Sequence, residues 1–444
     1  MSNTPTTSAG HTSQQAELLR RREKLLGKNT PLFYDQPLHL VRGQGVHLYD
    51  VNGHEYLDVY NNVANVGHCH PRVVAALSGQ ASTLNIHTRY LHETILDYAE
   101  SLTSTFADPL STVMFTCTGS EANDLALRMA RHATGAMGII CTSETYHGNT
   151  SAVDELATLF HDGEAVGAHV KSVPFPDTYR PEEGLQGQEL CDAYLRSVDQ
   201  AIVEFQQEGI GFAGVLMCPI FANEAVPNVP PGYLNGVAER VQAHNGLLIF
   251  DEVQSGFGRT GQLWGYEYVG VQPDIVTLGK PMGNGHPIAA VVASSELVNA
   301  FRNDVMYFNT FGGNPVSCAV AQAVLGVIED EQLVNNARDV GYYLRRGLQD
   351  LQQAHEVIGD VRGPGLFLGV ELVSDRQAKQ PATQLAAQVI NTMKAKRVLI
   401  SKIGPSDNVL KIRPPIVFSK NNADQLLDTL DGTLTELVAQ GAVS

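Results

Sequence analysis

Two short apolar segments of this chain each lead into a residue that can do chemistry. Residues 247–250 (Leu-Leu-Ile-Phe) precede Asp251 and Gln254, and residues 275–278 (Ile-Val-Thr-Leu) precede Lys280. Each segment has the length and composition of a buried strand, so we expect a carboxylate at one strand end and a lysine at the next. A carboxylate beside a ring nitrogen, with a lysine that can form a Schiff base, is what an enzyme needs to use pyridoxal phosphate as an electron sink.

Three further segments carry groups that suit a phosphorylated cofactor. Residues 116–123 (Thr-Cys-Thr-Gly-Ser-Glu-Ala-Asn) follow an expected strand and open a helix, so the amides of Gly119 and Ser120 would face an anion. Tyr146 and His147 follow another strand, where an aromatic face can stack on a ring, and a buried core tyrosine is the alternative interpretation. The polar loop at 308–315 can bring a hydroxyl and amides to a phosphate, but taken alone it is merely a turn.

A metal site is the weaker interpretation of the one compact cluster of possible ligands. His68, Cys69 and His70 lie together, but no matching second cluster supplies the remaining ligands. We therefore expect a structural turn that ends at Pro71 and no metal.

The composition excludes several classes of partner. The 444 residues carry a formal net charge of -17, which argues against a nucleic-acid-binding surface or an anionic membrane surface. No apolar run approaches the length of a membrane helix or a signal sequence. The six cysteines are scattered without paired spacing, which fits a reducing cytoplasm. An anionic small substrate would have to rely on locally placed arginine and lysine.

The rhythm of apolar segments predicts an α/β fold. Short strands alternate with helix-like segments, which indicates a mostly parallel sheet wrapped by helices. The expected strands of this sheet are at residues 113–115, 138–141, 214–217, 247–250, 275–278 and 288–293. Outside it we expect a helix at 17–27, an antiparallel meander at 37–60, a long helical pattern from 315 to 352, a strand at 366–372, a helix at 383–397 and a last helix after 421.

We divide the chain accordingly. Residues 1–16 are expected to form a disordered tail, because they are rich in Ser, Thr, Gln and Gly and have no apolar period. Residues 17–70 and 316–444 are assigned to a small domain built from both chain ends, and residues 71–315 to a large domain that binds the cofactor.

The combined motifs resemble the class III aminotransferase family of pyridoxal-phosphate enzymes, fold type I. The segments that carry this resemblance are 118–123, 146–148, 251–254, 279–280 and 310–315. The resemblance implies a large domain with a mostly parallel seven-stranded sheet, a smaller α+β domain and a homodimer with shared active sites.

The resemblance also implies roles for single residues. Lys280 would bond to pyridoxal 5'-phosphate and move protons at the substrate carbon, and Asp251 would keep the pyridine nitrogen protonated. Gly119, Ser120 and the neighbouring subunit's Thr310 would contact the cofactor phosphate. Tyr146 and His147 would contact its ring, and Gln254 would contact the ring oxygen.

A nearer resemblance is to the phospho-lyase branch of the family, which cleaves O-phosphoethanolamine or 5-phosphohydroxylysine. It rests on residues 60–71, 89–93, 176–180, 283–287 and 410–415. Residues 218–223 read Cys-Pro-Ile-Phe-Ala-Asn where class III aminotransferases usually read Glu-Pro-Ile-Gln-Gly-Glu. Asn223 and Lys411 therefore replace a glutamate and an arginine that gate 2-oxoglutarate in many relatives, although Glu224 can compensate.

We favour a phospho-lyase that eliminates phosphate from a small amine to give an aldehyde and ammonia. Arg89, Lys402 and Arg413 are the candidates for holding the substrate phosphate, and surface ion pairs are the alternative for each. A class III (omega) aminotransferase that acts on an amine or omega-amino acid is the second interpretation, and a racemase is the third. A protein without chemistry is disfavoured while Asp251 and Lys280 are both present.

Overall fold

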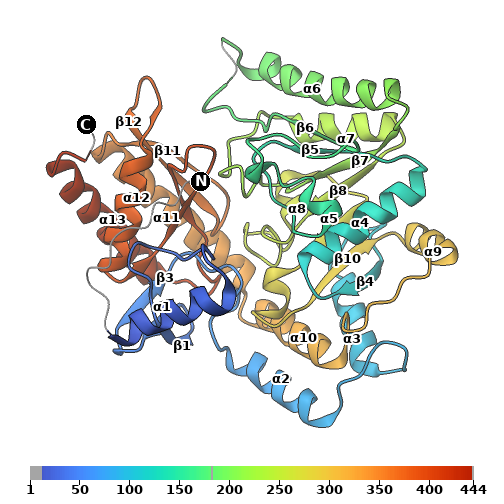
Figure 1. Ribbon diagram of the computed structural model, residues 1–444, viewed down its shortest axis with the longest axis horizontal. Coiled ribbons are helices and arrows are strands. Elements are labelled where there is room, and N and C mark those ends of the chain that lie inside the picture. Colours follow the sequence, from blue (N-terminus) through green and yellow to red (C-terminus); the bar gives the residue numbers. More distant parts are fainter. Residues whose placement is uncertain (1–12, 182–183, 443–444) are drawn as a thin grey trace.

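The chain folds into two lobes. The computed structural model describes residues 13–181 and 184–442. In Figure 1 the two ends of the chain, drawn blue and orange to red, form most of the left-hand lobe, and the green and yellow middle forms the right-hand lobe. A small domain made from both chain ends, beside a larger one, is the arrangement expected for this fold class.

The large lobe is built on a sheet of seven strands. The strand order is β4–β10–β9–β8–β7–β5–β6, and β10 alone runs antiparallel to both of its neighbours. The prediction of a mostly parallel sheet is confirmed. The strands are β4 (Thr112–Thr116), β5 (Gly138–Thr142), β6 (Val170–Val173), β7 (Phe212–Met217), β8 (Leu247–Asp251), β9 (Ile275–Leu278) and β10 (Ala289–Ala293).

Alternate side chains of these strands pack on opposite faces of the sheet. In β8, Ile249 joins the cluster beneath α4 and α9, whereas Leu248 and Phe250 join the cluster that contains α6 and α7. Both faces are covered by helices, as parallel sheets require. The helices named here are α4 (Gly119–Thr134), α6 (Gly187–Gln207), α7 (Tyr233–Ala243) and α9 (Ser295–Asp304).

The small lobe joins segments that lie far apart in the sequence. The expected N-terminal meander consists of β1 (Leu40–Gln44), β2 (His47–Asp50) and β3 (Glu55–Asp58), and β3 pairs in parallel with β14 (Val398–Leu399). A second sheet contains β11 (Ile358–Arg362), β12 (Leu368–Asp375), β13 (Gln380–Pro381), β15 (Ser401–Ile403) and β16 (Val409–Ile412).

The remaining helices differ from the expected ones mainly at their ends. The long helical pattern after 315 is two helices, because Gln332 adopts φ 52° between them and starts a new helix. The helices are α1 (Ser13–Leu26), α2 (Pro71–Thr83), α3 (Glu93–Thr103), α5 (Ser151–Asp154), α8 (Gly265–Val269), α10 (Pro315–Asp330), α11 (Leu333–Ala354), α12 (Thr383–Ala395) and α13 (Lys420–Ala439), with short 3-10 turns at Thr158–Phe160 and Lys280–Gly283.

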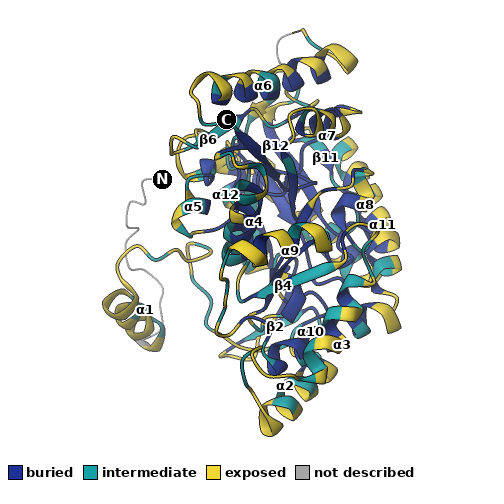
Figure 2. Cartoon of the chain, turned by 90° about the vertical axis from the view of Figure 1, so that its right-hand side faces the viewer, coloured by how far each residue is buried: buried dark blue, intermediate teal, exposed yellow. Residues whose placement is uncertain are grey.

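The domain boundaries stay a prediction, with two differences to note. Helix α10, which the boundary at 315/316 gives to the small domain, packs against α2 and α3. Residues 13–16, expected in the tail, form the first turn of α1, and the rest of that tail lies outside the described residues. Helix α1 is exposed over most of its surface (Figure 2).

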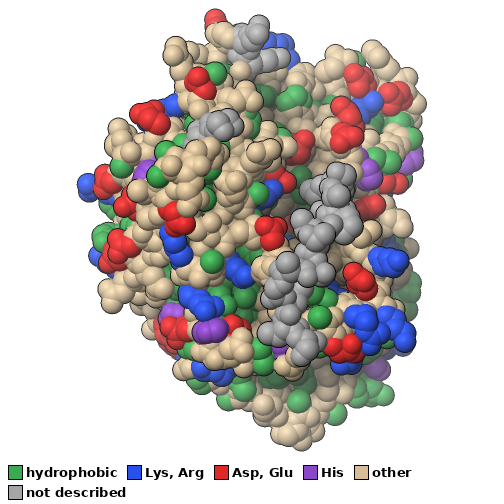
Figure 3. Space-filling view, turned by 60° about the vertical axis from the view of Figure 1, so that its left-hand side comes forward, with side chains coloured by type: hydrophobic (Ala, Val, Ile, Leu, Met, Phe, Trp, Pro, Cys, Tyr) green, Lys and Arg blue, Asp and Glu red, His purple; other side chains and the backbone are tan. Residues whose placement is uncertain are grey.

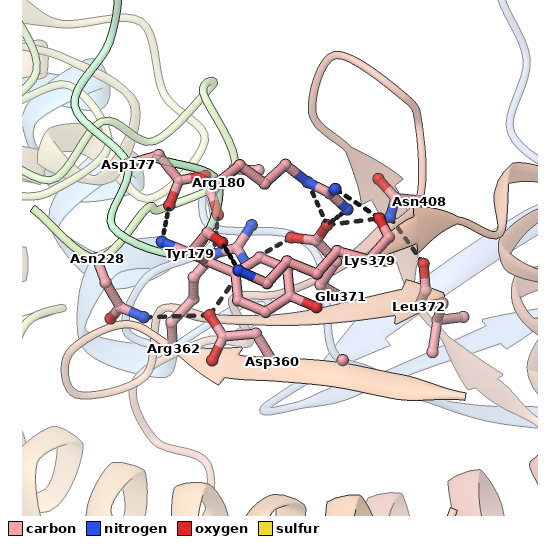
Figure 4. Close-up of polar contacts among 12 residues, drawn as sticks. Asp177, Tyr179, Arg180, Asn228, Asp360, Arg362, Glu371, Leu372, Lys379 and Asn408 are labelled. Atoms are coloured by element: carbon pink, nitrogen blue, oxygen red, sulfur yellow. Dashed lines mark hydrogen bonds and ion pairs between the residues drawn. The ribbon is translucent and has the colours of Figure 1, made fainter. Parts of the chain in front are cut away.

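A network of charges around the buried Glu371 connects the two lobes (Figure 4). Glu371 of β12 accepts hydrogen bonds from Arg180 Nε at 3.0 Å, from Arg362 Nη1 at 2.6 Å and from Asn408 Nδ2 at 3.3 Å. Asn228 Nδ2 of the large lobe donates to Asp360 Oδ2 of β11 at 3.1 Å. The network fixes β12 and the neighbouring β15–β16 hairpin relative to the large sheet.

Candidate functional site

The site is built where two neighbouring parallel strands end. Asp251 is the last residue of β8 and is paired with Thr277 of β9, and Lys280 follows β9 after one glycine. Gly279 lies so close to its neighbours that an added Cβ would be 3.3 Å from the side chain of Val253. Asp251 and Lys280 line one cavity of about 210 Å³, so the two residues expected from the strand pattern are brought together.

Asp251 is held as a carboxylate by three donors. Its Oδ2 accepts hydrogen bonds from His147 Nδ1 at 2.7 Å and Asn123 Nδ2 at 3.0 Å, and its Oδ1 accepts one from the Val253 amide at 2.9 Å. Burial opposes ionisation, but the hydrogen bond and the charge of His147 outweigh it and hold the pKa of Asp251 below its ordinary value. The carboxylate is therefore ready to hold a cation in the cavity.

Lys280 lines this cavity, and its side chain is exposed there. Removal from bulk water lowers the pKa of Lys280, Asp251 raises it, and the like charge of Arg413 lowers it further, so that the net direction is down. A lowered pKa increases the fraction of free amine, which is the form that attacks a carbonyl and accepts a proton.

The N-terminus of helix α4 forms one end of the cavity. The side chain of Thr118 accepts from the Glu121 amide, and the side chain of Glu121 accepts from the amides of Cys117 and Thr118. Within the described part of the chain, the amides of Gly119 and Ser120 donate a hydrogen bond to no protein acceptor. These two amides, at the positive end of a helix, are the expected place for an anion.

The loop after β5 closes on this helix end and brings Tyr146 and His147 to the cavity. A Cβ at Gly148 would lie 2.6 Å from Ser120 Oγ, so only glycine allows the approach. Tyr146 lines the cavity and packs edge-on against Phe160, with ring centroids 5.4 Å apart. His147 is buried behind Asp251.

Gln254 also lines the cavity, but protein groups hold both ends of its amide. Its Nε2 donates to Asn223 Oδ1 at 3.0 Å, and its Oε1 accepts from Arg413 Nη1. Asn223 Nδ2 in turn donates to the carbonyl of Tyr146 at 2.9 Å. The expected contact of Gln254 with a ring oxygen stays a prediction.

A second cavity of about 700 Å³ adjoins the first and shares Tyr146, Asn223, Gln254 and Lys280 with it. Its wall includes Lys402, Lys411 and Arg413 from the β15–β16 hairpin and the segment that follows it. Lys402 and Arg413 are two of the three residues that the sequence analysis selects for holding the substrate phosphate. The structure brings both of them to the mouth of the Lys280 cavity.

The three cations differ in what surrounds them. Lys402 Nζ lies 2.8 Å from Asp407 Oδ2, and Arg413 lies over the ring of Tyr60, with its guanidinium carbon 4.3 Å from the ring centroid. Lys411 is 3 % exposed and has no ion-pair partner among the described residues. Burial and the charges of Arg413 and Lys280 hold the pKa of Lys411 well below its ordinary value.

Sequence reasoning did not select Lys411 as a ligand. It entered only as the residue that replaces an arginine. Its position two residues before Arg413 was the available signal, because residues i and i+2 of a strand point to the same face.

Arg89 and Thr310 lie elsewhere in the chain's own structure. Both are exposed, and the Arg89 guanidinium carbon is 3.8 Å from the centroid of the Phe308 ring. Arg89 lines a separate surface cavity of about 380 Å³ together with Asn309 and Gly312, and that cavity shares no residue with the two at Lys280. Arg89 therefore does not contact the Lys280 cavity of its own chain.

Glu224 does not take the place of the missing glutamate. It is 1 % exposed and is turned into the protein, where it accepts hydrogen bonds from Thr142 Oγ1 at 2.6 Å and the Asn223 amide at 3.0 Å. Neither cavity at Lys280 has Glu224 in its wall. The expectation that Glu224 can gate the cavity is wrong.

The histidines of the possible metal cluster have carboxylate partners. His68 Nε2 lies 2.6 Å from Asp58 Oδ2, and His70 Nε2 lies 3.1 Å from Glu331 Oε1. The Asp58 carboxylate also accepts hydrogen bonds from the amides of Tyr60 and Asn61. The His68–Asp58 pair therefore supports the segment that carries Tyr60, whose ring lies against Arg413.

Comparison with known proteins places the chain in a family. The family described as aminotransferase class-III matches residues 33–434. This chain belongs to the class III aminotransferase family. The resemblance read from the motifs is confirmed, and the match covers both lobes.

Individual relatives divide between two activities. An alanine–glyoxylate aminotransferase 2-like protein of Drosophila melanogaster is 41% identical over 97% of this chain and 89% of its own length. An ethanolamine-phosphate phospho-lyase homologue of Caenorhabditis elegans is 39% identical over 98% of this chain and 97% of its own. A solved phospholyase from Arthrobacter, in complex with phosphoethanolamine, is 46% identical with a TM-score of 0.91, covering 95% of this chain and all of that one.

The surface adds two observations. On the face shown in Figure 3, acidic and basic side chains are interspersed. Within residues 13–181 and 184–442, no helix is both long enough and apolar enough to cross a membrane.

Proposed function

We propose that this class III family member is a pyridoxal-phosphate-dependent phospho-lyase that eliminates phosphate from a small phosphorylated amine such as O-phosphoethanolamine. The observation that carries the proposal is the cluster of Lys402, Lys411 and Arg413 at the mouth of the Lys280 cavity. A phosphate dianion would complete this cluster, because it supplies the negative charge that Lys411 lacks. The phospho-lyase names among the relatives support the same substrate class.

The residues at the first cavity fit the cofactor. The free amides of Gly119 and Ser120 suit its phosphate, the ionised Asp251 suits a protonated ring nitrogen, and Lys280 supplies the amine for a covalent link. When bound, pyridoxal phosphate would accept the electron pair left on the substrate carbon. Tyr146 and Val253, also in the cavity wall, would contact its ring.

The reaction then needs few protein groups. Lys280 would take the proton from the carbon that carries the amine. The C–O bond on the adjacent carbon would break, and its electron pair would leave with the phosphate, which the cationic cluster holds. Water would hydrolyse the released enamine to acetaldehyde and ammonia. The role of the cluster is to orient the phosphate and stabilise the charge that it gains.

A homodimer would give Arg89 and Thr310 a role. Large apolar side chains beside them are open to solvent: Leu91 is 98% exposed, Met306 86% and Phe311 71%. Such a patch is typical of a protein interface. We infer that Arg89 and Thr310 of one subunit face the cofactor and substrate of its partner.

An aminotransferase is the second candidate, because the same Asp251 and Lys280 serve amino transfer and one relative carries that name. Comparing O-phosphoethanolamine with ethanolamine separates the two. The phospho-lyase converts only the phosphorylated amine and releases phosphate. Consumption of both amines at similar rates, dependent on a keto acid, would instead establish the aminotransferase.

A further inference from the structure

Asn123 is a buried amide of helix α4 that contacts three other segments of the large lobe. The Nδ2 of Asn123 donates to Asp251 Oδ2 at 3.0 Å and to the backbone carbonyl of His147 at 2.7 Å. The Oδ1 of Asn123 accepts a hydrogen bond from Thr277 Oγ1 at 2.6 Å. One side chain therefore joins α4 to the end of β8, to the loop after β5 and to β9.

These contacts allow the Asn123 amide only one orientation. An ionised carboxylate and a backbone carbonyl can only accept, so both protons of Asn123 Nδ2 are used on Asp251 and His147. If Oδ1 and Nδ2 exchanged places, three oxygen atoms would face one another. The Thr277 hydroxyl must donate, because Asn123 Oδ1 can only accept. Both side chains are buried, so no bulk water competes for these hydrogen bonds.

The elements that Asn123 and Thr277 join are those that carry the expected cofactor contacts. Helix α4 begins at Gly119, where the phosphate of the cofactor is expected. Thr277 is the residue of β9 that is paired with Asp251, and it lies three residues before Lys280. Neither Asn123 nor Thr277 is in the wall of the cavities at Lys280. Any effect of the two residues on a bound cofactor must therefore pass through Asp251 and its neighbours.

We propose that Asn123 and Thr277 are positioning residues: the Thr277 hydroxyl fixes the direction of the Asn123 amide, and the amide holds the Asp251 carboxylate toward the protonated ring nitrogen of the cofactor. Without the amide, Asp251 loses one of its three donors, turns more freely and is less stabilised as an anion. Its hold on the ring nitrogen weakens as a result. The inference rests on the proposed use of pyridoxal phosphate at Asp251.

Two cofactors, each titrated by absorbance into the full-length apoenzyme without substrate, test the inference. One is pyridoxal phosphate, and the other is its analogue in which a C–H group replaces the ring nitrogen. Asn123→Ala should weaken the binding of pyridoxal phosphate about tenfold, the loss of one hydrogen bond to a charged group, and should change the binding of the analogue less than about threefold. A side chain that merely supported the cavity would affect both cofactors equally.

Asn408→Ala is the matched control. Asn408 is also buried, and its Nδ2 likewise donates to one carboxylate, Glu371 Oε1 at 3.3 Å, and to one backbone carbonyl, that of Leu372 at 2.7 Å. These hydrogen bonds lie in the small lobe and do not reach Asp251. Asn408→Ala should therefore leave unchanged the affinity ratio, which is the affinity for pyridoxal phosphate divided by that for the analogue.

Thr277→Val and Thr277→Ser test the other half of the pair and decide alone if Asn123→Ala does not fold. Thr277→Val keeps the shape of the side chain but leaves Asn123 Oδ1 without its donor, so the affinity ratio should fall about threefold. Thr277→Ser keeps the hydroxyl and should retain the ratio of the unchanged protein.

Three results would overturn the inference. They are an equal effect of Asn123→Ala on both cofactors, an unchanged affinity ratio in Thr277→Val, and a ratio in Thr277→Ser as low as that in Thr277→Val. Failure of the unchanged protein to bind pyridoxal phosphate would overturn the proposed function itself.

Discussion

Lys411 is a buried lysine without a carboxylate partner within the described residues, and keeping its amine protonated there costs folding free energy. Lys280 is a second cation of lowered pKa in the same place, and Arg413 is a third. Like charges gather in this way where a bound anion supplies the missing charge. At the scale of residues, these cations should therefore favour substrate binding and lower the stability of the protein without substrate.

Replacing Lys411 tests this opposition. Lys411→Met should raise the thermal unfolding midpoint, because an unpaired buried charge is removed, and should raise KM for O-phosphoethanolamine about tenfold or more. Lys420→Met, which removes an exposed charge on α13, is the matched control and should change neither quantity. A Lys411→Met protein with unchanged KM would show that Lys411 does not bind the phosphate.

The pKa of Lys411 also predicts a pH dependence. The native state releases the proton of Lys411 at a lower pH than the unfolded chain, where the pKa is about 10.4. Between these two pKa values the unfolded state binds more protons, so the unfolding free energy of the unchanged protein rises with pH relative to Lys411→Met. Denaturant titrations of both proteins over that range measure the difference, and parallel curves would contradict the prediction.

Lys280→Ala should abolish turnover and leave the fold intact, because the Lys280 side chain is exposed and lines a cavity. Product assays and circular dichroism measure the two effects. Retention of full activity by this variant would contradict the assignment of Lys280.

The residues that bear on the cofactor were predictable to different degrees. The proximity of Asp251 and Lys280 was predictable, because parallel strands place their carboxyl ends at one edge of a sheet. The contact between His147 and Asp251 was not predictable, since it depends on how the loop after β5 packs against the end of β8. Arg89 was expected at the substrate phosphate, and its place beside Phe308, away from the Lys280 cavity of its own chain, follows from tertiary packing that no local pattern encodes.

At the scale of elements, the β15–β16 hairpin carries the cations, and β12 holds the hairpin to the large lobe. Neither short strand was expected, because Ser401–Ile403 and Val409–Ile412 each contain a lysine that interrupts the apolar pattern. Strand β6 (Val170–Val173) went unnoticed for the same reason. The other six strands of the central sheet were found, since no lysine interrupts their apolar pattern.

Glu371 should determine how firmly the lobes are joined. Burial opposes its ionisation, but Arg362 and Arg180 outweigh burial and hold the pKa of Glu371 below its ordinary value. Glu371→Gln removes the carboxylate that Arg180 and Arg362 share, and only Arg362 keeps another, Asp360 Oδ2 at 3.2 Å. The substitution should lower the unfolding free energy by about 3 kcal/mol. Glu17→Gln breaks the exposed pair with Arg20 on α1 and should have little effect.

Acidic pH should reduce the difference in unfolding free energy between the unchanged protein and Glu371→Gln. Because its folded pKa is lowered, its stabilisation is present above the unfolded pKa of about 4.3 and is lost as pH falls through the folded pKa. Denaturant titrations at a series of pH values should therefore show the curves of the unchanged protein and Glu371→Gln converging below about pH 4. A constant gap would show that the charge of Glu371 is not the cause.

At the scale of the whole molecule, the proposed dimer makes each site depend on two chains. The family and the fold were predictable because the motifs extend along nearly the whole chain, whereas the interface was not, because exposed apolar residues give no pattern until the chain has folded.

Mixed dimers test whether Arg89 serves the partner's site. Arg89→Met and Lys280→Ala should each be nearly inactive alone. A mixed dimer of the two would combine Lys280 of one chain with Arg89 of the other in one complete site, and mixing should restore activity. No restoration would place Arg89 at its own chain's substrate or outside the site.

The central claim is elimination of phosphate from a phosphorylated amine, and counting turnovers tests it most directly. The cofactor-loaded protein is given excess O-phosphoethanolamine with no keto acid, and phosphate, acetaldehyde and ammonia are measured per Lys280 site. The proposal predicts equal amounts of the three products over many turnovers. Consumption of at most one amine per site, with no phosphate released, would contradict it.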